Sequence, residues 1–394
     1  MASIRKRTWN KGDETRTAWV ADYFDQGGKR HLKTFATRKA ADDWLVKARD
    51  EVARGVHTAE NASITVGEAA DLWLQRCELE RLERSTLRQY RTHVDLHIRP
   101  RIGGEKLARI TTPKVEAFKD QLAGSLSRAM AGKVLTSLKS IISEAQRRGM
   151  VAHNVAAPVR IRTSARENGR LMVGRDIPTK AEVQALIAEA KGRWRPFFVT
   201  AIFAGMRASE LRGLTWNDVD FDRKVIHVRQ RANLWGEIGA PKSAAGDREI
   251  PLAPMVVSAL REWRLACPQG PLGLVFPNGR GRVESHANIL NRGWYPLQVV
   301  AGVAEPAMSE AGDPVLGDDG KQAMQAKYGL HSTRHFFASW IIERGFSPKR
   351  CQVLLGHSSI QMTFDVYGHL FPSLEDDHAK FADGEVALLG AVAG

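Results

Sequence analysis

Residues 1–60 alternate between short apolar runs and turn-forming residues. Residues 4–9, 17–24 and 30–35 predict three β-strands, because asparagine, aspartate and glycine residues separate the runs. Thr37 predicts the N-cap of a helix that extends to about Val52. The second strand is expected to alternate between two faces, with Trp19, Ala21 and Tyr23 on one and Val20, Asp22 and Phe24 on the other.

Apolar residues recur with the spacing of α-helices through residues 64–158. Residues 66–79 predict one amphipathic helix, and Ser85 is expected to open a second. The Thr-Pro pair at 112–113 predicts a helix cap followed by a first-turn proline. The longest helix is expected at 127–148. This stretch therefore predicts an all-α domain.

Residues 159–176 lack apolar periodicity, are rich in arginine and predict a linker. The segment Thr179–Glu182 has the spacing of a capping box and is expected to open the next helix. The fold class predicted for the whole chain is multidomain α+β. A small three-stranded sheet plus helix occupies residues 1–60 and the all-α domain residues 64–158, and a mainly helical domain with a small antiparallel sheet occupies residues 177–394.

Positive charge indicates the kind of partner. The chain has 58 Lys and Arg against 44 Asp and Glu, a net charge of +14, which favours a polyanion such as nucleic acid. Residues 61–163 carry 18 basic and 10 acidic side chains, whereas residues 164–394 carry 27 and 25. This distribution is typical of a basic binding module joined to a catalytic one. A merely solvated cationic surface is the alternative.

Cysteine usage and hydropathy indicate the compartment. Cys77, Cys267 and Cys351 are too few and too scattered for a disulfide framework or a metal cluster, which favours a reducing cytosol. The basic start is followed by no apolar signal region, and no apolar run is long enough to span a bilayer. We therefore expect a soluble cytoplasmic protein with no membrane partner.

Candidate chemistry begins after the linker. Arg207 stands where one apolar helix is predicted to end at a glycine and another to begin, and a structural ion pair with Glu210 is the alternative interpretation. Strands are predicted at 225–229 and 248–252. Lys242 would then stand at the tip of the hairpin between them, where an ordinary solvated lysine is the alternative.

Three further landmarks follow in the C-terminal third. His331 and Arg334 are three residues apart and share one face of a predicted helix. His357 follows a Leu-Gly pair that is expected to stop a helix, and Tyr367 lies ten residues later. His331 and His335 have the spacing of a zinc pair, but the glutamate of the zincin motif is absent and no third ligand is evident.

This ordered set resembles the tyrosine recombinases of the phage integrase family. The most specific blocks are Gly-Met-Arg-Ala-Ser-Glu-Leu, His-Ser-Thr-Arg-His, and Leu-Leu-Gly-His-Ser-Ser with a following tyrosine. The resemblance covers most of the chain, with the N-terminal modules matching in outline. It implies a site-specific recombinase that cleaves and rejoins DNA through a 3′-phosphotyrosine intermediate. Such an integrase would integrate or excise a phage or mobile element in a bacterial host cell.

The resemblance also implies catalytic roles that suit this chemistry. Tyr367 would be the nucleophile, since a phenol is a better leaving group than an alcohol when the covalent bond is reversed. Arg207 and Arg334 would hold the non-bridging phosphate oxygens, and Lys242 would protonate the 5′ leaving oxygen. No metal or nucleotide cofactor is required.

Three more residues receive roles from the same resemblance. His331 would be an acid–base partner near the tyrosine, and His357 would donate a hydrogen bond to the phosphate. Glu210 would orient Arg207 without contacting the phosphate itself.

The family's organisation implies how the other modules meet DNA. Residues 64–158 would be the core-binding domain and residues 1–60 an arm-type DNA-binding domain. Partners would be double-stranded attachment sites, a homotetramer assembled on DNA through the C-terminal tail, and an accessory directionality factor. The cations expected to contact DNA in the helical domain are Arg88, Arg91, Lys133, Lys139 and Arg147.

Two rival interpretations remain open at this point. A type IB topoisomerase shares the tyrosine chemistry but relaxes supercoils without exchanging partners. A DNA-binding regulator that has lost catalysis would retain the basic modules alone. Covalent trapping of DNA, and the products that follow, distinguish the three.

Overall fold

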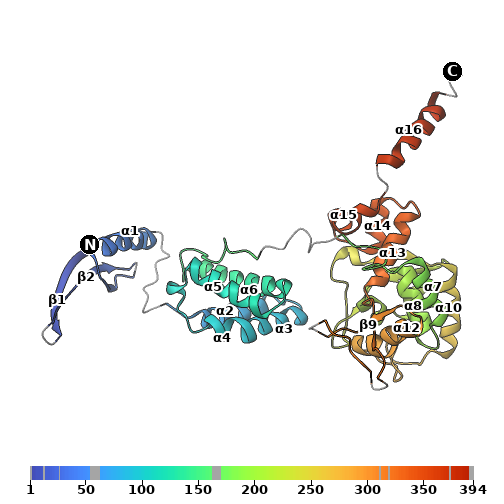
Figure 1. Ribbon diagram of the computed structural model, residues 1–394, viewed down its shortest axis with the longest axis horizontal. Coiled ribbons are helices and arrows are strands. Elements are labelled where there is room, and N and C mark those ends of the chain that lie inside the picture. Colours follow the sequence, from blue (N-terminus) through green and yellow to red (C-terminus); the bar gives the residue numbers. More distant parts are fainter. Residues whose placement is uncertain are drawn as a thin grey trace. The chain divides into compact units, whose positions relative to one another are not determined.

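The computed structural model describes residues 2–11, 14–25, 27–53, 63–161, 170–309, 312–317, 320–371 and 374–389. The chain divides into two compact units, Met1–Asn168 and Gly169–Gly394. Figure 1 shows the helices and strands of both. Among the described residues, no helix combines the length and the apolar character needed to cross a membrane.

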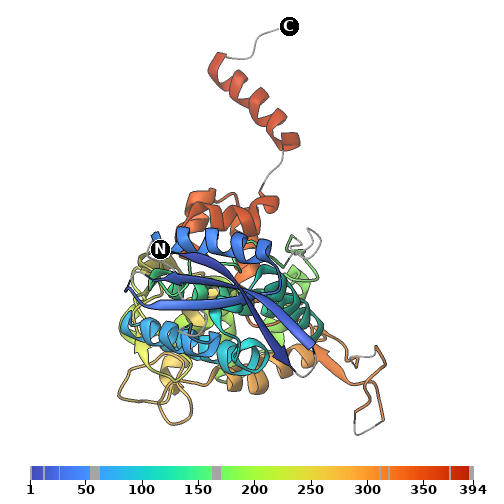
Figure 2. The same cartoon turned by 90° about the vertical axis from the view of Figure 1, so that its left-hand side faces the viewer.

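Three antiparallel strands open the first unit in the order β1-β2-β3: β1 (Ser3–Lys11), β2 (Glu14–Phe24) and β3 (Arg30–Phe35). Helix α1 (Arg38–Ala53) covers one face of this sheet (Figure 2), where Leu45 packs with Ala21 and Tyr23. The Thr37 hydroxyl accepts a hydrogen bond from the Ala40 amide at 3.2 Å. The predicted strands, helix and cap are confirmed.

Strand β2 is continuous, as predicted, and its C-terminal half is buried on both faces. Val20, Ala21, Asp22 and Tyr23 are all buried, so both faces are covered there. Asp22 tolerates burial because Nε of Arg30 on the neighbouring strand donates to its carboxylate at 2.8 Å.

The helical part of the first unit consists of α2 (Val66–Leu79), α3 (Arg84–His93), the π-helix η1 (Val94–Ile98), α4 (Arg99–Ile102), the 3-10 turn η2 (Leu107–Arg109), α5 (Thr112–Ser125) and α6 (Arg128–Arg147). Apolar side chains at the predicted helical spacing form one core, including Trp73, Ile98, Phe118 and Leu138. The all-α prediction is confirmed, and α6 is the longest of these helices.

Two helix starts differ from the prediction. Helix α3 begins at Arg84, one residue before Ser85. The cap position of α5 is Thr111, because the Thr112 hydroxyl instead donates to the Val155 carbonyl at 3.1 Å. The proline in the first turn of α5 is as predicted.

The second unit is mainly helical. Its α-helices are α7 (Lys180–Glu189), α8 (Trp194–Ala204), α9 (Ala208–Gly213), α10 (Pro254–Ala266), α11 (His286–Ile289), α12 (Tyr295–Val300), α13 (Ser332–Glu343), α14 (Pro348–Leu355), α15 (Ile360–Tyr367) and α16 (Leu374–Leu389). Shorter helical turns are η3 (Trp216–Asp218), η4 (Ala244–Gly246), η5 (Leu290–Trp294) and η6 (Gly368–Leu370). Thr179 and Glu182 form the predicted capping box of α7.

Small antiparallel sheets complete this unit. Strands β4 (Val219–Asp220), β5 (Val225–Val228) and β8 (Arg248–Pro251) pair in the order β4-β5-β8. Two further pairs are β6 (Arg231–Ala232) with β7 (Ile238–Gly239) and β9 (Ala304–Pro306) with β10 (Met324–Ala326). The predicted fold class, a multidomain α+β chain with these three kinds of module, is confirmed.

The connection between β5 and β8 is longer than the single hairpin predicted from sequence. The two strands pair as expected, but the β6–β7 hairpin is inserted between them. Its turn is built by Asn233, whose side-chain oxygen accepts from the amides of Trp235 and Glu237. Lys242 therefore lies after β7, on the segment that leads into β8, and not at a hairpin tip.

Candidate active site

Arg207 occupies the sharp corner between α8 and α9. Gly205 ends α8 with φ of 58°, and a Cβ there would lie 2.1 Å from the Phe337 ring, so only glycine fits. Arg207 then takes the cap position of α9 and its amide donates to Glu210 at 2.9 Å. The corner thus fixes the backbone from which Arg207 projects.

Glu210 is a buried carboxylate, 2% exposed, that holds two arginines. Nη1 of Arg207 donates to it at 2.8 Å, and Nη2 of Arg248 donates to its other oxygen at 2.9 Å. Burial opposes ionisation, yet the charges of Arg248 and Arg207 outweigh it and lower the pKa of Glu210. The ion pair between Arg207 and Glu210 that the sequence suggested is present, and Arg248 forms a second ion pair with the same carboxylate.

Both predicted phosphate-binding arginines are oriented by carbonyls of the turn that follows α14. Nη2 of Arg207 donates to the Gly356 carbonyl at 3.0 Å, and Arg334 donates to the adjacent Leu355 carbonyl. Nη1 of Arg334 also donates to the Gly205 carbonyl at 2.8 Å. Arg207 and Arg334 therefore converge on one turn from α9 and α13.

That turn requires Gly356. It ends α14 with φ of 63°, and a Cβ there would lie 2.9 Å from both the Ala245 carbonyl oxygen and Nη1 of Arg248. His357 follows at once and is buried, with Nδ1 2.9 Å from the Thr363 hydroxyl. Burial and the neighbouring arginines lower the pKa of His357 to about 4, so the ring is neutral at pH 7.

Tyr367 is the last residue of α15 and is 1% exposed. Its ring stacks on His357, with the ring planes 4° apart and the centroids separated by 6.3 Å. Its hydroxyl lies 2.8 Å from Nδ1 of His335. Burial raises the pKa of Tyr367 to about 12, against the attraction of Arg334 for the phenolate. The phenol therefore needs a base before it can attack.

His331 and His335 lie side by side at the start of α13, with ring centroids 4.8 Å apart. Burial and the positive charges nearby lower the pKa of His331 to about 4. In the part of the chain that the structure describes, no group of three or more His, Cys, Asp or Glu side chains has the arrangement of a metal site.

Lys242 is exposed on the segment before η4. This segment reaches the site through Ala245 and Gly246, since the Ala245 carbonyl lies against Gly356 and the Gly246 carbonyl accepts from Arg248 at 2.9 Å. Arg207, Arg334, His357 and Tyr367 therefore meet around the turn at 355–357, and His331 joins them through the ring of His335. Lys242 lies on the neighbouring segment, whose residues 245–246 contact this cluster.

Sequence reasoning missed Arg248 and the position of His335 beside Tyr367. Arg248 is buried and binds Glu210 and the Leu354 carbonyl, but it belongs to a strand and to none of the recognised blocks. His335 stands inside the His-Ser-Thr-Arg-His block, where the sequence suggested only a zinc spacing. Its proximity to the phenol depends on how α15 packs against α13.

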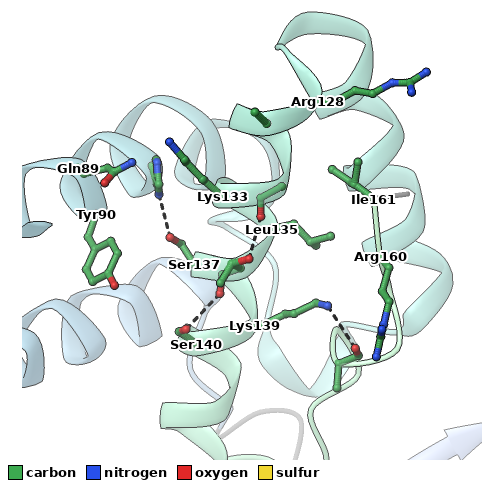
Figure 3. A pocket seen from close by; sticks show the side chains of 15 residues that line it. Gln89, Tyr90, Arg128, Lys133, Leu135, Ser137, Lys139, Ser140, Arg160 and Ile161 are labelled. Carbon is green, nitrogen blue, oxygen red and sulfur yellow. Dashed lines mark hydrogen bonds between the residues drawn. The ribbon is translucent and has the colours of Figure 1, made fainter. Parts of the chain in front are cut away.

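In the helical domain, two of the predicted DNA-contacting residues line one cavity of about 660 Å³ (Figure 3). Lys133 and Lys139 face it from α6, together with Arg128 and Arg160. Lys139 is half-buried and donates to the Ala157 carbonyl at 3.2 Å. Burial and the charge of Arg160 lower the pKa of Lys139. This cavity concentrates positive charge on one side of the domain.

The other three candidates lie elsewhere in the helical domain. Arg88 is exposed on α3. Arg91 forms an ion pair with Glu78, and Arg147 donates to the buried Glu144 at 2.6 Å. Two of the three therefore already have carboxylate partners.

Similarity to known proteins agrees with this geometry. Residues 178–373 match the phage integrase family, and residues 65–123 match the family described as phage integrase, N-terminal SAM-like domain. Prophage integrase IntR of Escherichia coli is 27% identical over 216 residues, 54% of this chain and 50% of that relative. A tyrosine recombinase XerC-like protein of Caldanaerobacter subterraneus is 24% identical over 382 residues, 88% of this chain and 90% of the relative.

Solved structures share the fold. The Tn1549 transposon integrase in complex with a circular intermediate DNA has a TM-score of 0.62 and 18% identity, covering 82% of this chain and all of that one. A lambda integrase tetramer bound to a Holliday junction has a TM-score of 0.56 and 19% identity, covering 86% and 93%. The enzyme class defined by fold and sequence together is the tyrosine recombinase. The chain belongs to the phage integrase family.

Proposed function

We propose that this chain cleaves and rejoins DNA at attachment sites through a covalent 3′-phosphotyrosine bond to Tyr367. The observation that carries the proposal is the convergence of Arg207, Arg334, His357 and Tyr367 around the turn at 355–357. Two guanidinium groups beside a buried phenol suit a phosphodiester, whose charge increases in the transition state.

In this mechanism each side chain has a separate task. Arg207 and Arg334 bind the non-bridging oxygens, and His357 donates a hydrogen bond to one of them. Lys242 protonates the departing 5′ oxygen when bound DNA brings the segment between β7 and β8 toward the phosphate. Glu210 and Arg248 keep Arg207 in place, and His331 supports proton transfer near the tyrosine.

The decisive test uses a nicked suicide substrate, on which cleavage traps DNA on the protein. We expect Tyr367→Phe to form no covalent complex while it retains specific DNA affinity, because one hydroxyl carries the chemistry and little of the binding energy. Trapping by Tyr367→Phe at the wild-type rate would remove Tyr367 from its role. Supercoil relaxation without recombinant products would instead favour a topoisomerase.

The helical domain would bind the DNA backbone through the cavity lined by Lys133 and Lys139. The charge of the half-buried Lys139 suits phosphate oxygens, since a partly buried ammonium group gains most from an anionic partner, and the exposed Lys133 would add a second cation beside it. The β1–β3 sheet would contact separate arm sites. Through these modules the enzyme would integrate or excise a phage or mobile element in the bacterial cytoplasm, with an accessory factor setting the direction.

Assembly on DNA would take four protomers, with the C-terminal helix α16 docking on a neighbour. Its side chains Phe381, Val386 and Leu388 are exposed, although they are apolar enough to require a partner surface. Deleting residues 378–394 is therefore expected to preserve binding to one site and to reduce synapsis, measured by gel shift with two labelled sites. Wild-type synapsis by the shortened chain would assign the helix to its own subunit.

A further inference from the structure

We propose that His335 is the catalytic base that takes the proton from the Tyr367 hydroxyl during cleavage and returns it during rejoining. The inference rests on the proposed function and assigns a residue outside the six that the family resemblance supplied. It places the proton acceptor on the residue that follows Arg334, on the same turn of α13.

Geometry is the first support. Nδ1 of His335 lies 2.8 Å from the Tyr367 oxygen, and the rings meet edge to face at 61°. With Tyr367 only 1% exposed, bulk water has little access to the hydroxyl, so the acceptor has to be a protein group. The His331 ring packs against the His335 ring at an interplanar angle of 88°.

The charges around His335 suit a base that is neutral at rest. Burial lowers the pKa of His335 below its ordinary value, and Arg334 lowers it further. Asp176, on the segment that precedes α7, acts in the opposite direction and stabilises the imidazolium once it forms. Tyr367 itself and His331 are the other titratable groups that face the ring. At pH 7 Nδ1 can therefore accept the hydrogen bond that the phenol donates.

In the cleavage step, proton transfer from Tyr367 is coupled to phosphoryl transfer. The O–H bond of Tyr367 breaks and its proton moves to Nδ1 of His335. The phenolic oxygen forms a bond to phosphorus while the bond from phosphorus to the 5′ oxygen breaks, and that oxygen takes a proton from Lys242. Rejoining runs the same transfers in reverse, with the imidazolium of His335 returning the proton to the departing phenol.

The test compares full-length wild type, His335→Asn and His331→Asn in single-turnover cleavage of the suicide substrate between about pH 5.5 and pH 9. Asparagine places a hydrogen-bonding atom close to the position of Nδ1 but cannot accept a proton at these pH values. A residue that only positions the tyrosine would therefore tolerate His335→Asn, whereas a base would not. DNA affinity of each variant, measured by gel shift, verifies that the fold is intact.

We expect wild-type cleavage to be constant from pH 9 to below about pH 6.5 and to decrease only toward the acidic end of the range, because burial and Arg334 hold the pKa of His335 below its ordinary value and the neutral imidazole is the active form. His335→Asn should cleave about 10²–10³-fold more slowly at pH 7. Its rate should increase with pH throughout, because the phenol must then ionise without a base. His331→Asn should retain the wild-type pH profile even where its rate is lower.

Chemical rescue gives an independent readout. Added imidazole should accelerate His335→Gly and leave Tyr367→Phe inactive, because the free base replaces the missing ring but not the nucleophile. Wild-type rate and pH profile in His335→Asn, or loss of the acidic limb in His331→Asn, would overturn the assignment to His335. Absence of trapped DNA with wild type would instead contradict the proposed function itself.

Discussion

Each unit of this protein contains a buried glutamate surrounded by arginines. The two clusters differ in the other groups that these arginines bind. In the helical domain, Glu144 accepts hydrogen bonds from Arg76, Arg147 and Arg148, and Arg76 also donates to a second carboxylate, that of Glu80. In the catalytic unit, Glu210 accepts from Arg207 and Arg248, which also bind backbone carbonyls.

Exposure separates the two clusters further. The arginine side chains around Glu144 are 34–54% exposed, so water shares their charge. Arg248 is 2% exposed and Arg207 33%, so Glu210 holds one arginine in the interior and one at the surface of the site. The same residue types therefore stabilise a helix pair in one place and, in the other, orient the arginine that we propose binds phosphate. Only the second use requires a fixed direction for the guanidinium.

The largest effect is expected from Glu210→Gln. Removing the negative charge leaves Arg248 buried without a counter-ion, which costs about 3–5 kcal/mol of stability, and frees Arg207 from its orienting partner. Single-turnover cleavage should decrease about 10–100-fold.

A matched control is Glu144→Gln, which removes the corresponding charge from the other cluster. It should leave the cleavage rate at saturating DNA unchanged, because Glu144 holds arginines of the helical domain and not Arg207. Equal losses of cleavage in both variants would show that the two clusters do not differ in function.

The sequence predicted most of this arrangement, since the signals are local. The Gly205 and Gly356 turns, the cap of α7 and the register of His331 with Arg334 all follow from residues close together in the chain. The proposed catalytic residues could be predicted together because they stand in separate local blocks whose order is characteristic of the family.

Long-range partners were not predictable in the same way. Arg248 binds Glu210 across 38 residues, and His335 meets Tyr367 across 32, so each contact depends on the packing of whole elements. The β6–β7 insertion was missed because both strands are only two residues long and show no alternation. Residues 162–169 of the linker predicted at 159–176 lie outside the described residues.

The second-largest expected effect is a loss of stability of the helical domain in the Glu144→Gln variant. Glu144→Gln should weaken the attachment of α2 to α6 by about 2 kcal/mol, less than a fully buried pair, because its arginines remain partly hydrated. Hydrogen exchange of the α2 and α6 amides in the full chain measures this change. Unaltered protection would mean that apolar packing alone holds these helices together.

The same carboxylate predicts a dependence on pH. Burial raises the pKa of Glu144, but the hydrogen bonds from Arg76, Arg148 and Arg147 outweigh it and lower the value to about 2. A carboxyl whose pKa is depressed by folding contributes its full stabilisation above its ordinary pKa and loses it as the pH decreases toward the folded value. Protection of α2 and α6 should therefore decrease between about pH 4.5 and pH 2 in wild type, and less steeply in Glu144→Gln.

The smallest expected effect is on DNA affinity. It distinguishes cations that have carboxylate partners from those that line the cavity of the helical domain. Lys133→Gln should weaken DNA binding a few-fold and reduce the slope of log affinity against log salt concentration by about one, because one phosphate contact is lost. Arg147→Gln should change that slope much less, since Arg147 is engaged with Glu144 and most of its charge is already compensated. Gel-shift titrations at several salt concentrations measure both slopes on the same DNA. If Arg147→Gln reduces the slope as much as Lys133→Gln does, the Glu144 cluster also contacts DNA, and the contrast between a structural and a functional arginine cluster no longer holds.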